Sequence, residues 1–353
     1  MIREVSGNLL SADAEALVNT VNTVGVMGKG IALQFKRAYP QMFKDYQKEA
    51  KAGRLSLGHM QVWPTAAVDG PKYIINFPTK GHWRSASRLV DIEAGLADLA
   101  TVVRDLRIRS VAVPPLGCGH GGLVWSDVRP KIVEALAPLD DVEVLLFAPG
   151  VVPAASSMPT GTARPRMTPG RAALVQLLSG YQEQTVDPSL VEVQKLLYFS
   201  QAAGEPLRLR FVKGLYGPYA DNLRHVLTAV EGHFLSGYGD GSSPVLDAEP
   251  IRVIGGAQQQ ALDVLRDLPD TEARIERVLQ LCEGFESMYG MELLASVHWV
   301  ASASNPQPAT NAQAAAQQVG SWTPRKKRLF TFDHVKVAWS ALEGQGWIAP
   351  ART

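Results

Sequence analysis

The first 150 residues alternate between short apolar runs and longer amphipathic segments. Runs rich in β-branched and aromatic residues predict strands, whereas apolar residues that recur every three or four positions predict helices. Because strands and helices follow one another in turn, the pattern favours an α/β sandwich with a largely parallel or mixed sheet. The predicted strands are 2–5, 17–20, 60–63, 73–77, 111–114 and 142–147, and the predicted helices are 31–39, 41–52, 87–106 and 126–136.

Beyond residue 168 the apolar spacing is that of helices packed on one another. Residues 151–168 contain three prolines among small residues and predict a linker. The chain therefore divides into a domain at 1–150, this linker, and a mainly helical domain at 169–353. The predicted helices are 172–178, 190–203, 220–234, 257–268, 271–289 and 331–347, and the Ala- and Gln-rich stretch 302–320 is either a loop or a weak helix.

Composition narrows the class of protein. A length of 353 residues suits two or three domains, and 46% apolar with 20% charged residues is typical of a soluble globular chain. A net charge of +1 excludes binding of nucleic acid through a large basic field alone. Two distant cysteines exclude a disulfide framework and a cysteine-rich zinc site. Without a secretory signal or an apolar run of about 18 residues, we expect a cytoplasmic protein with no membrane contact.

Two glycine-rich loops each connect a predicted strand to the helix that follows it. The first spans 19–30, and the second spans 114–123 with four glycines in six residues. Glycine lets the backbone approach a ligand closely, and a helix N-terminus offers free N–H groups, so both loops suit phosphate. A tight turn explains the first loop equally well when that loop is taken alone. Two such loops together predict a site for a diphosphate.

The residues of these loops resemble a known family. The segments 6–9 (SGNL), 19–22 (NTVN), 28–32 (GKGIA) and 115–119 (PLGCG) together resemble the macro domain, over residues 1 to about 149. Within that superfamily, 78–83 (PTKGHW) resembles the branch of ADP-ribosyl glycohydrolases that uses a lysine. With its helical extension, the whole chain resembles the DNA ADP-ribosyl glycohydrolase antitoxins, which are paired with a DNA-modifying toxin.

This resemblance implies a three-layer α/β/α macro domain with a mixed sheet and an ADP-ribose site. Lys80 is the implied catalytic residue, which either forms a Schiff base with the opened distal ribose or stabilises its departure. His120 stands where related human-type enzymes have an acid, and we interpret it as a proton shuttle. The implied ADP-ribose-binding residues are Asn8, Leu9, Asn22, Gly28, Lys29, Gly30, Ile31, Leu116, Gly117, Cys118, Gly119, His120, Gly121, Gly122 and Phe147, with Ile75 as a further wall residue.

Several of these residues have a simpler explanation. In related proteins an acidic residue usually accepts a hydrogen bond from the adenine amino group. Asn8 stands at that position here, so its side-chain amide must serve as the acceptor. Lys80 also fits a solvated lysine at the rim of a phosphate site, because a lysine with the usual pKa of about 10.4 is protonated at neutral pH. Desolvation or a cationic neighbour would lower the pKa of Lys80. The candidates for residues that surround its amine are His82, Trp83, Arg84 and Lys29.

Two other features are expected to be structural. Cys118 fits a small packing residue better than a nucleophile. The basic run 325–328 fits a solvated charged face. In the second half, Tyr216, Gly217 and Pro218 predict a turn that begins the next helix.

The resemblance implies a hydrolase that acts on ADP-ribosylated single-stranded DNA, with thymine as the modified base. It implies that the helical domain binds the cognate DNA ADP-ribosyltransferase toxin, and that no metal or cofactor takes part. A non-catalytic reader of ADP-ribose fused to a toxin-binding module is the alternative, and a hydrolase of a small ADP-ribose derivative is a third hypothesis.

Overall fold

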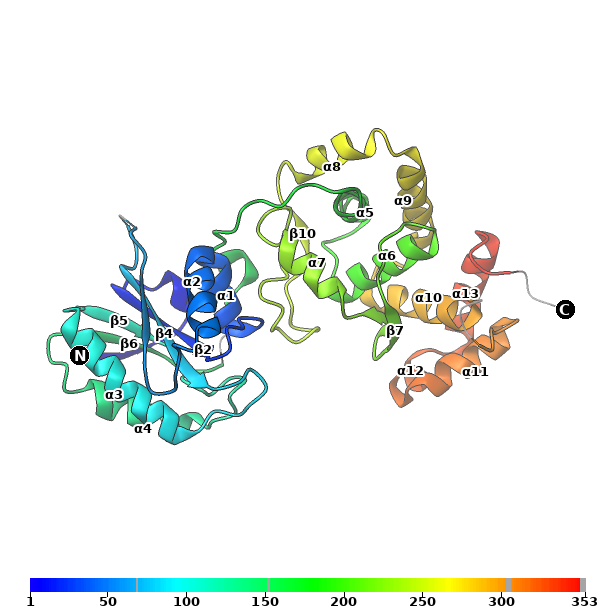
Figure 1. Cartoon of the computed structure of the whole chain (residues 1–353). Helices are drawn as coiled ribbons and strands as arrows, with labels where there is room; N and C mark the ends of the chain where they lie inside the picture. Colours follow the sequence, from blue (N-terminus) through cyan, green and yellow to red (C-terminus); the bar gives the residue numbers. More distant parts are fainter. Residues whose placement is uncertain (68, 151–152, 303–305, 350–353) are drawn as a thin grey trace. The chain divides into compact units, whose positions relative to one another are not determined.

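The structure is a computed structural model that describes residues 1–67, 69–150, 153–302 and 306–349. The chain forms two compact units (Figure 1). The first comprises Met1–Ala163 and Gly239–Ser243, and the second comprises Arg164–Tyr238 and Pro244–Thr353. Residues 151–152 of the predicted linker and 303–305 of the Ala- and Gln-rich stretch lie outside the described residues.

A six-stranded sheet forms the centre of the first unit, in the order β1-β6-β5-β2-β4-β3. Five neighbouring strands are parallel, and β3 pairs antiparallel with β4, so the predicted mixed sheet is confirmed. The strands are β1 (Ile2–Val5), β2 (Ala16–Asn22), β3 (Gln61–Pro64), β4 (Tyr73–Lys80), β5 (Ser110–Val113) and β6 (Glu143–Phe147).

Helices cover both faces of this sheet. Because side chains alternate along a strand, Val18 of β2 packs into one hydrophobic core, and Leu17 and Val21 pack into the other. Two helices bury their apolar sides in each core, which gives the three-layer α/β/α arrangement that the resemblance to macro domains implies. One layer holds α1 (Gly30–Ala38) and α2 (Pro40–Lys51), and the other holds α3 (Leu89–Asp105) and α4 (Trp125–Leu136).

The second unit is mainly helical, and it also contains two short two-stranded sheets, the hairpin of β7 (Phe211–Gly214) with β8 (Gly217–Ala220) and the pair of β9 (Leu235–Ser236) with β10 (Arg252–Val253). A single hydrophobic core joins these elements. The helices are α5 (Pro169–Gln184), α6 (Leu190–Ala202), α7 (Leu223–Val230), α8 (Ala257–Leu265), α9 (Pro269–Cys282), α10 (Met288–Ala301), α11 (Ala312–Trp322), α12 (Pro324–Leu329) and α13 (Phe332–Gly344).

Two predictions of secondary structure in this unit are wrong. Gly217 and Pro218 lie in strand β8, not in a turn that opens a helix, and Gly217 has a φ of +92°. The single helix predicted at 271–289 is the end of one helix and the start of another. The chain leaves α9 at Cys282 and turns through Gly284, whose φ of +81° favours glycine, before α10 begins at Met288.

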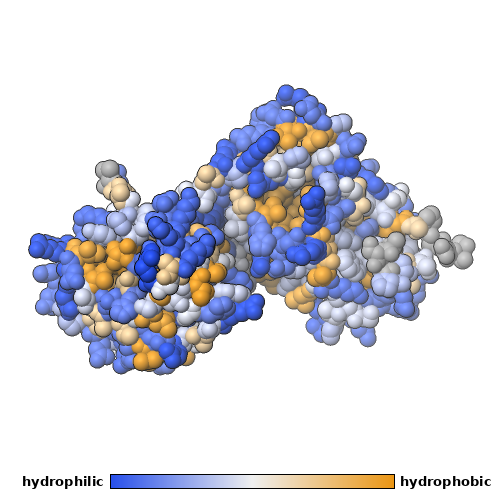
Figure 2. Space-filling model, viewed as in Figure 1, coloured by the Kyte–Doolittle hydropathy of each residue, from blue (hydrophilic) through white to orange (hydrophobic). Residues whose placement is uncertain are grey.

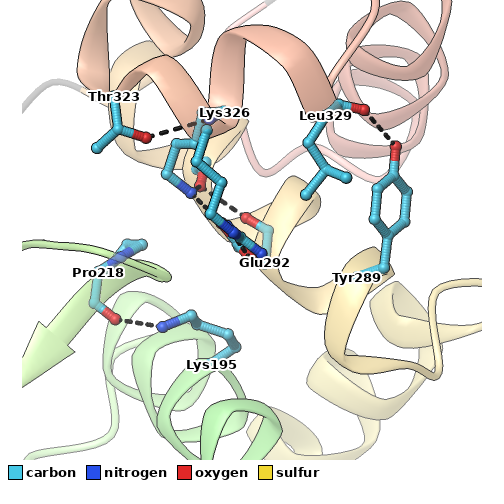
Figure 3. A network of polar contacts seen from close by, with 9 residues as sticks. Lys195, Pro218, Tyr289, Glu292, Thr323, Lys326 and Leu329 are labelled. Atoms are coloured by element: carbon cyan, nitrogen blue, oxygen red, sulfur yellow. Dashed lines mark hydrogen bonds and ion pairs between the residues drawn. The ribbon is translucent and has the colours of Figure 1, made fainter. Parts of the chain in front are cut away.

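A buried group of charges joins α6, α10 and α12 (Figure 3). Lys326 donates to Glu292 Oε1 at 2.5 Å and to Ser296 Oγ at 3.0 Å, and Arg325 also pairs with Glu292. Lys195 donates to the carbonyl oxygen of Pro218 at 2.6 Å. The prediction of a solvated charged face at 325–328 is therefore wrong for Lys326, because Glu292 holds its side chain inside the helical unit.

Exposed hydrophobic residues form several separate areas on the surface of the protein. Figure 2 shows mostly hydrophilic residues on the face in view, with several distinct hydrophobic areas between them. Val212, Leu215 and Tyr219, all on the β7–β8 hairpin, are among the exposed large hydrophobic residues. No helix in the described part of the chain is long and apolar enough to cross a membrane.

Candidate active site

The carboxyl ends of the parallel strands meet at one edge of the sheet. At this edge Val5 of β1 pairs with Phe147 of β6, and Asn22 of β2 pairs with Lys80 of β4. Strand β4 continues three residues beyond its predicted end, so Lys80 is the last residue of the strand. Ligands of open α/β sheets bind at this edge, and the structure brings the predicted loops together there.

Asn22 holds the first glycine-rich loop in shape. Its side chain accepts the N–H groups of Val24 and Val26 at 3.2 Å and donates to the carbonyl of Val26 at 2.6 Å. Tyr46 of α2 donates its hydroxyl to the Asn22 carbonyl at 2.5 Å, and burial raises the pKa of Tyr46 to about 12. The buried Asn22 side chain therefore supports the first loop.

The first loop ends at an open helix N-terminus. Gly30 begins α1 with a φ of +57°, and Lys29 before it provides no side-chain cap. Within the described residues, the N–H groups of Gly30, Ile31 and Ala32 meet no acceptor. Such N–H groups, with the positive end of the helix dipole, favour an anion.

The second glycine-rich loop is folded by its own backbone. Three N–H groups donate within it, from Cys118 to Pro115, from Gly122 to Gly119 and from Leu123 to Gly117. The N–H groups of Gly119, His120 and Gly121 find no acceptor in the part of the chain that the structure describes. This leaves three adjacent donors for an anionic ligand.

Close packing explains why Gly121 must be a glycine. A Cβ at this position would lie 2.4 Å from the carbonyl oxygen of Gly117 and 2.3 Å from Ser87 Oγ. Ser87 also donates its backbone N–H to the Gly121 carbonyl at 2.9 Å. The second loop therefore rests directly on the segment that precedes α3.

Lys80 reaches this loop from the end of β4. Its Nζ donates to the carbonyl oxygen of His120 at 2.9 Å, and its side chain is half-buried. No carboxylate lies within 4.0 Å of the Lys80 amine among the described residues. Partial burial lowers the pKa of Lys80 from its usual value. Desolvation is the cause of this shift, and no cationic neighbour contributes to it.

The two glycine-rich loops approach each other at His120. A Cβ placed on Gly30 would lie 3.8 Å from Cδ2 and 4.0 Å from Nε2 of the His120 imidazole, which is exposed. The start of α1, the second loop and the Lys80 amine thus border one another. We call these three parts the strand-end cradle.

Other predicted residues have contacts within the first unit. Asn8 caps the 3-10 helix Leu9–Ser11, because its Oδ1 accepts the N–H of Leu10 at 3.0 Å, and its Nδ2 donates to the Ser157 carbonyl. Burial raises the pKa of Cys118 to about 11, so its thiol stays protonated at neutral pH. The two predicted wall residues, Ile75 and Phe147, have buried side chains in the hydrophobic cores, and so do the predicted binding residues Leu9 and Leu116.

Sequence reasoning missed two residues that shape the site. Tyr46 sits on the apolar side of a predicted helix, where its spacing is that of any core residue. Ser87 stands at a predicted helix start, where a serine usually indicates an N-cap. No local signal distinguishes either from an ordinary structural residue. Among the described residues, no three His, Cys, Asp or Glu side chains gather as they would around a metal ion.

Comparisons with known proteins place the chain in a family. The Macro domain family matches residues 18–132. A DNA ADP-ribosyl glycohydrolase of Mycobacterium tuberculosis is 47% identical over 355 residues, which cover 96% of this chain and 98% of that protein. One of Thermus aquaticus is 43% identical over 350 residues, which cover 99% and 95%. The chain belongs to the DNA ADP-ribosyl glycohydrolase family.

Membership of the DNA ADP-ribosyl glycohydrolase family confirms the prediction of a hydrolase with a macro domain, and the structure confirms the mainly helical extension. A solved structure, the macrodomain of Mycobacterium tuberculosis DarG, is 59% identical and covers 42% of this chain and 99% of its own, with a TM-score of 0.42. A DNA ADP-ribosyl transferase-DNA ADP-ribosyl glycohydrolase fusion protein of Thermosipho africanus is 34% identical over 160 residues, which cover 41% of each chain.

Proposed function

We propose that this protein removes ADP-ribose from thymine in single-stranded DNA, with Lys80 as the catalytic residue. The observation that carries the proposal is the 2.9 Å contact between Lys80 Nζ and the His120 carbonyl. This contact puts the amine against the loop whose free N–H groups suit a diphosphate. A sugar attached to that diphosphate would then lie next to the amine.

Each part of ADP-ribose has a group suited to it. The N–H groups of Gly119, His120 and Gly121 would bind one phosphate, and the N-terminus of α1, with Lys29 beside it, would bind the other. Asn8 Oδ1 has a second lone pair besides the one that accepts the Leu10 N–H, and that lone pair suits the adenine amino group. Asn22 acts by shaping the first loop.

The reaction breaks the bond between C1″ of the distal ribose and a nitrogen of the base. Water supplies a hydroxyl to C1″ and a proton to the departing base, so the products are ADP-ribose and unmodified DNA. Lys80 acts in one of two ways. Either its neutral amine attacks C1″ and displaces the base, and water then hydrolyses the resulting Schiff base of the opened sugar, or its ammonium group stabilises the negative charge that develops on the departing base. We assign the transfer of this proton to His120, whose exposed ring lies beside Gly30.

We further propose that the helical unit binds the cognate DNA ADP-ribosyltransferase toxin, which makes the protein an antitoxin by two routes. The support is twofold. A relative carries a DNA ADP-ribosyl transferase and a DNA ADP-ribosyl glycohydrolase in one fusion protein. The β7–β8 hairpin also presents the apolar side chains of Val212, Leu215 and Tyr219 to solvent.

Hydrolysis is tested with a panel of three substrates, namely a thymine-ADP-ribosylated single-stranded oligonucleotide, an ADP-ribosylated protein and a free ADP-ribose derivative. The proposal expects release of ADP-ribose from the oligonucleotide alone, and faster release than from a guanine-modified oligonucleotide of matched sequence. Binding of all three substrates without release would favour a reader. Preferential cleavage of the free derivative would favour a hydrolase of small metabolites.

Toxin binding is tested with the full-length Lys80→Ala variant, so that hydrolysis does not contribute. We expect this variant to inhibit the transferase at a ratio near one to one, measured as ADP-ribose transferred to an oligonucleotide. If inhibition disappears together with hydrolysis, the helical unit does not neutralise the toxin by binding.

A further inference from the structure

The loop between β4 and α3 is anchored to both glycine-rich loops of the strand-end cradle. At its start, Thr23 donates its hydroxyl to the Gly81 carbonyl at 2.8 Å. At its end, the N–H of Ser87 donates to the Gly121 carbonyl at 2.9 Å. The residues between these two anchors are therefore held at the rim of the cradle, directly after Lys80.

A tight turn at the middle of this loop carries an exposed tryptophan. The N–H of Ser85 donates to the His82 carbonyl at 3.0 Å, and the N–H of Arg84 donates to His82 Nδ1 at 3.2 Å. These bonds fix the turn and place Trp83 at its tip, where the residue is 44% exposed. A large aromatic ring held rigidly in water at the edge of a site is typical of a surface that binds a partner.

The neighbours of Trp83 support its ring. The His82 ring centroid lies 5.2 Å from that of Trp83, and the Arg84 guanidinium carbon lies 4.4 Å from the Trp83 centroid. Arg84 makes no ion pair with any carboxylate in the described residues. Segment 81–88 contains no acidic residue. The platform formed by His82, Trp83 and Arg84 is therefore aromatic and cationic.

Aromatic rings beside unpaired cations are the elements with which proteins bind a single nucleic acid strand. Bases stack on the rings, and phosphates lie against the cations. Trp83 is three residues beyond Lys80, so their Cα atoms are at most about 10 Å apart. A base that adjoins the modified one is within reach of the platform.

We propose that Trp83, supported by His82 and Arg84, stacks on the base next to the ADP-ribosylated base, and that the Arg84 guanidinium binds the adjoining phosphate. This inference rests on the proposed function, and it adds a reason for the enzyme to prefer a strand over an isolated nucleotide. The platform is separate from the residues that would bind ADP-ribose itself.

The first test compares two substrates, an ADP-ribosylated thymine within an oligonucleotide and ADP-ribosylated thymidine alone. Trp83→Ala should lower the ratio of kcat/KM for the oligonucleotide to kcat/KM for thymidine by about tenfold or more, mainly through KM. Trp83→Phe should restore most of this ratio. Leu106→Ala, which alters an exposed apolar residue at the far end of α3, should leave the ratio unchanged.

An unchanged ratio in Trp83→Ala would overturn the proposal. An equal loss on both substrates would overturn it too, because the residue would then support the cradle rather than the strand. Arg84→Gln should reduce the salt dependence of oligonucleotide binding by about one phosphate contact.

The second test separates the platform from the proposed hydrolysis. Binding of an unmodified single-stranded oligonucleotide is measured by fluorescence anisotropy with the wild type and with Trp83→Ala. If the wild type releases no ADP-ribose from any DNA, the proposed function fails, but weaker oligonucleotide binding by Trp83→Ala still supports the platform. Equal binding by both proteins, with loss of toxin inhibition in Trp83→Ala, would show instead that Trp83 contacts a protein.

Discussion

Two lysines of this protein illustrate what a lowered pKa does and does not indicate. Lys80 and Lys195 each donate to a backbone carbonyl, at 2.9 Å and 2.6 Å. Desolvation lowers the pKa of both, and for Lys195, where the charge of Lys326 adds to the effect, the pKa falls to about 7. Judged by pKa alone, Lys195 would be the better nucleophile.

The surroundings of the two amines reverse that judgement. Lys195 is only 1% exposed and lies within the core of the helical unit, with Glu292 and Lys326 nearby. Lys80 is half-buried and borders free backbone N–H groups at the carboxyl ends of parallel strands. A shifted pKa marks a reactive lysine only when a substrate can reach it. We therefore assign a structural role to Lys195 and propose a catalytic role for Lys80.

The largest expected effect separates these two roles directly. Lys80→Ala should lower the rate of ADP-ribose release by about a hundredfold to ten-thousandfold, because it removes the reactive amine. Its melting temperature should change by no more than about 2 °C, since the lysine makes one partly exposed hydrogen bond. Lys44→Ala, at an exposed position of α2, is the matched control. Full turnover by Lys80→Ala would end the assignment.

Removing Glu292 from the buried charges of the helical unit should instead lower the stability of the protein. Glu292→Ala leaves Lys326 inside the helical unit without its carboxylate partner, and this should destabilise the unit by about 3–5 kcal/mol. Denaturant unfolding measures the loss, and Glu276→Ala on the exposed side of α9 is the control. If Glu292→Ala is as stable as the wild type, the ion pair has no structural role.

A smaller effect is expected in the second glycine-rich loop. Gly121→Ala forces a Cβ against Ser87 Oγ and the Gly117 carbonyl, which should cost about 1–3 kcal/mol and weaken ADP-ribose binding. A Cβ on Gly119 has no neighbour within 4 Å, so Gly119→Ala should leave the stability of the free protein nearly unchanged. Calorimetry of unfolding and of ADP-ribose binding distinguishes the two variants. Equal stability in both would mean that the loop is not packed as described.

The last expected effect is a dependence of stability on pH. The pKa of Lys195 is lower in the folded than in the unfolded protein, so between about pH 7 and pH 9.5 the unfolded state binds more protons. The free energy of unfolding should therefore rise with pH in this range, by up to about 1.4 kcal/mol per pH unit. Lys195→Met should reduce this slope, whereas Lys336→Met at an exposed site should keep it. A slope unaffected by Lys195→Met would contradict the assigned pKa shift.

The sequence predicts the macro-domain half well because its signals are local. Apolar runs mark the six strands, and glycine-rich loops mark the junctions where ligands of such sheets bind. The end of strand β4 is an exception to this success, because Pro78 and Lys80 do not favour a strand in the sequence pattern. Pairing with β2 extends β4 as far as Lys80, and no local pattern contains that information.

The helical half is less predictable for physical reasons. Residues 290–301 of α10 were not predicted because the helix is buried on nearly all sides, so it lacks the polar face that reveals a helical period. Lys326 is buried by a partner 34 residues away, which the local run of charges conceals. In the site, the contact of Lys80 with the His120 carbonyl joins positions 40 residues apart and likewise requires the fold.

The position of the sugar relative to Lys80 tests the central claim most directly. A crystal structure of the Lys80→Ala variant with ADP-ribosylated thymidine would reveal it. We predict that C1″ of the distal ribose lies about 3–4 Å from the place of the missing amine, with the diphosphate against the N–H groups of Gly119, His120 and Gly121. A ligand bound with its distal ribose turned away from position 80, and its diphosphate outside the strand-end cradle, would contradict the account.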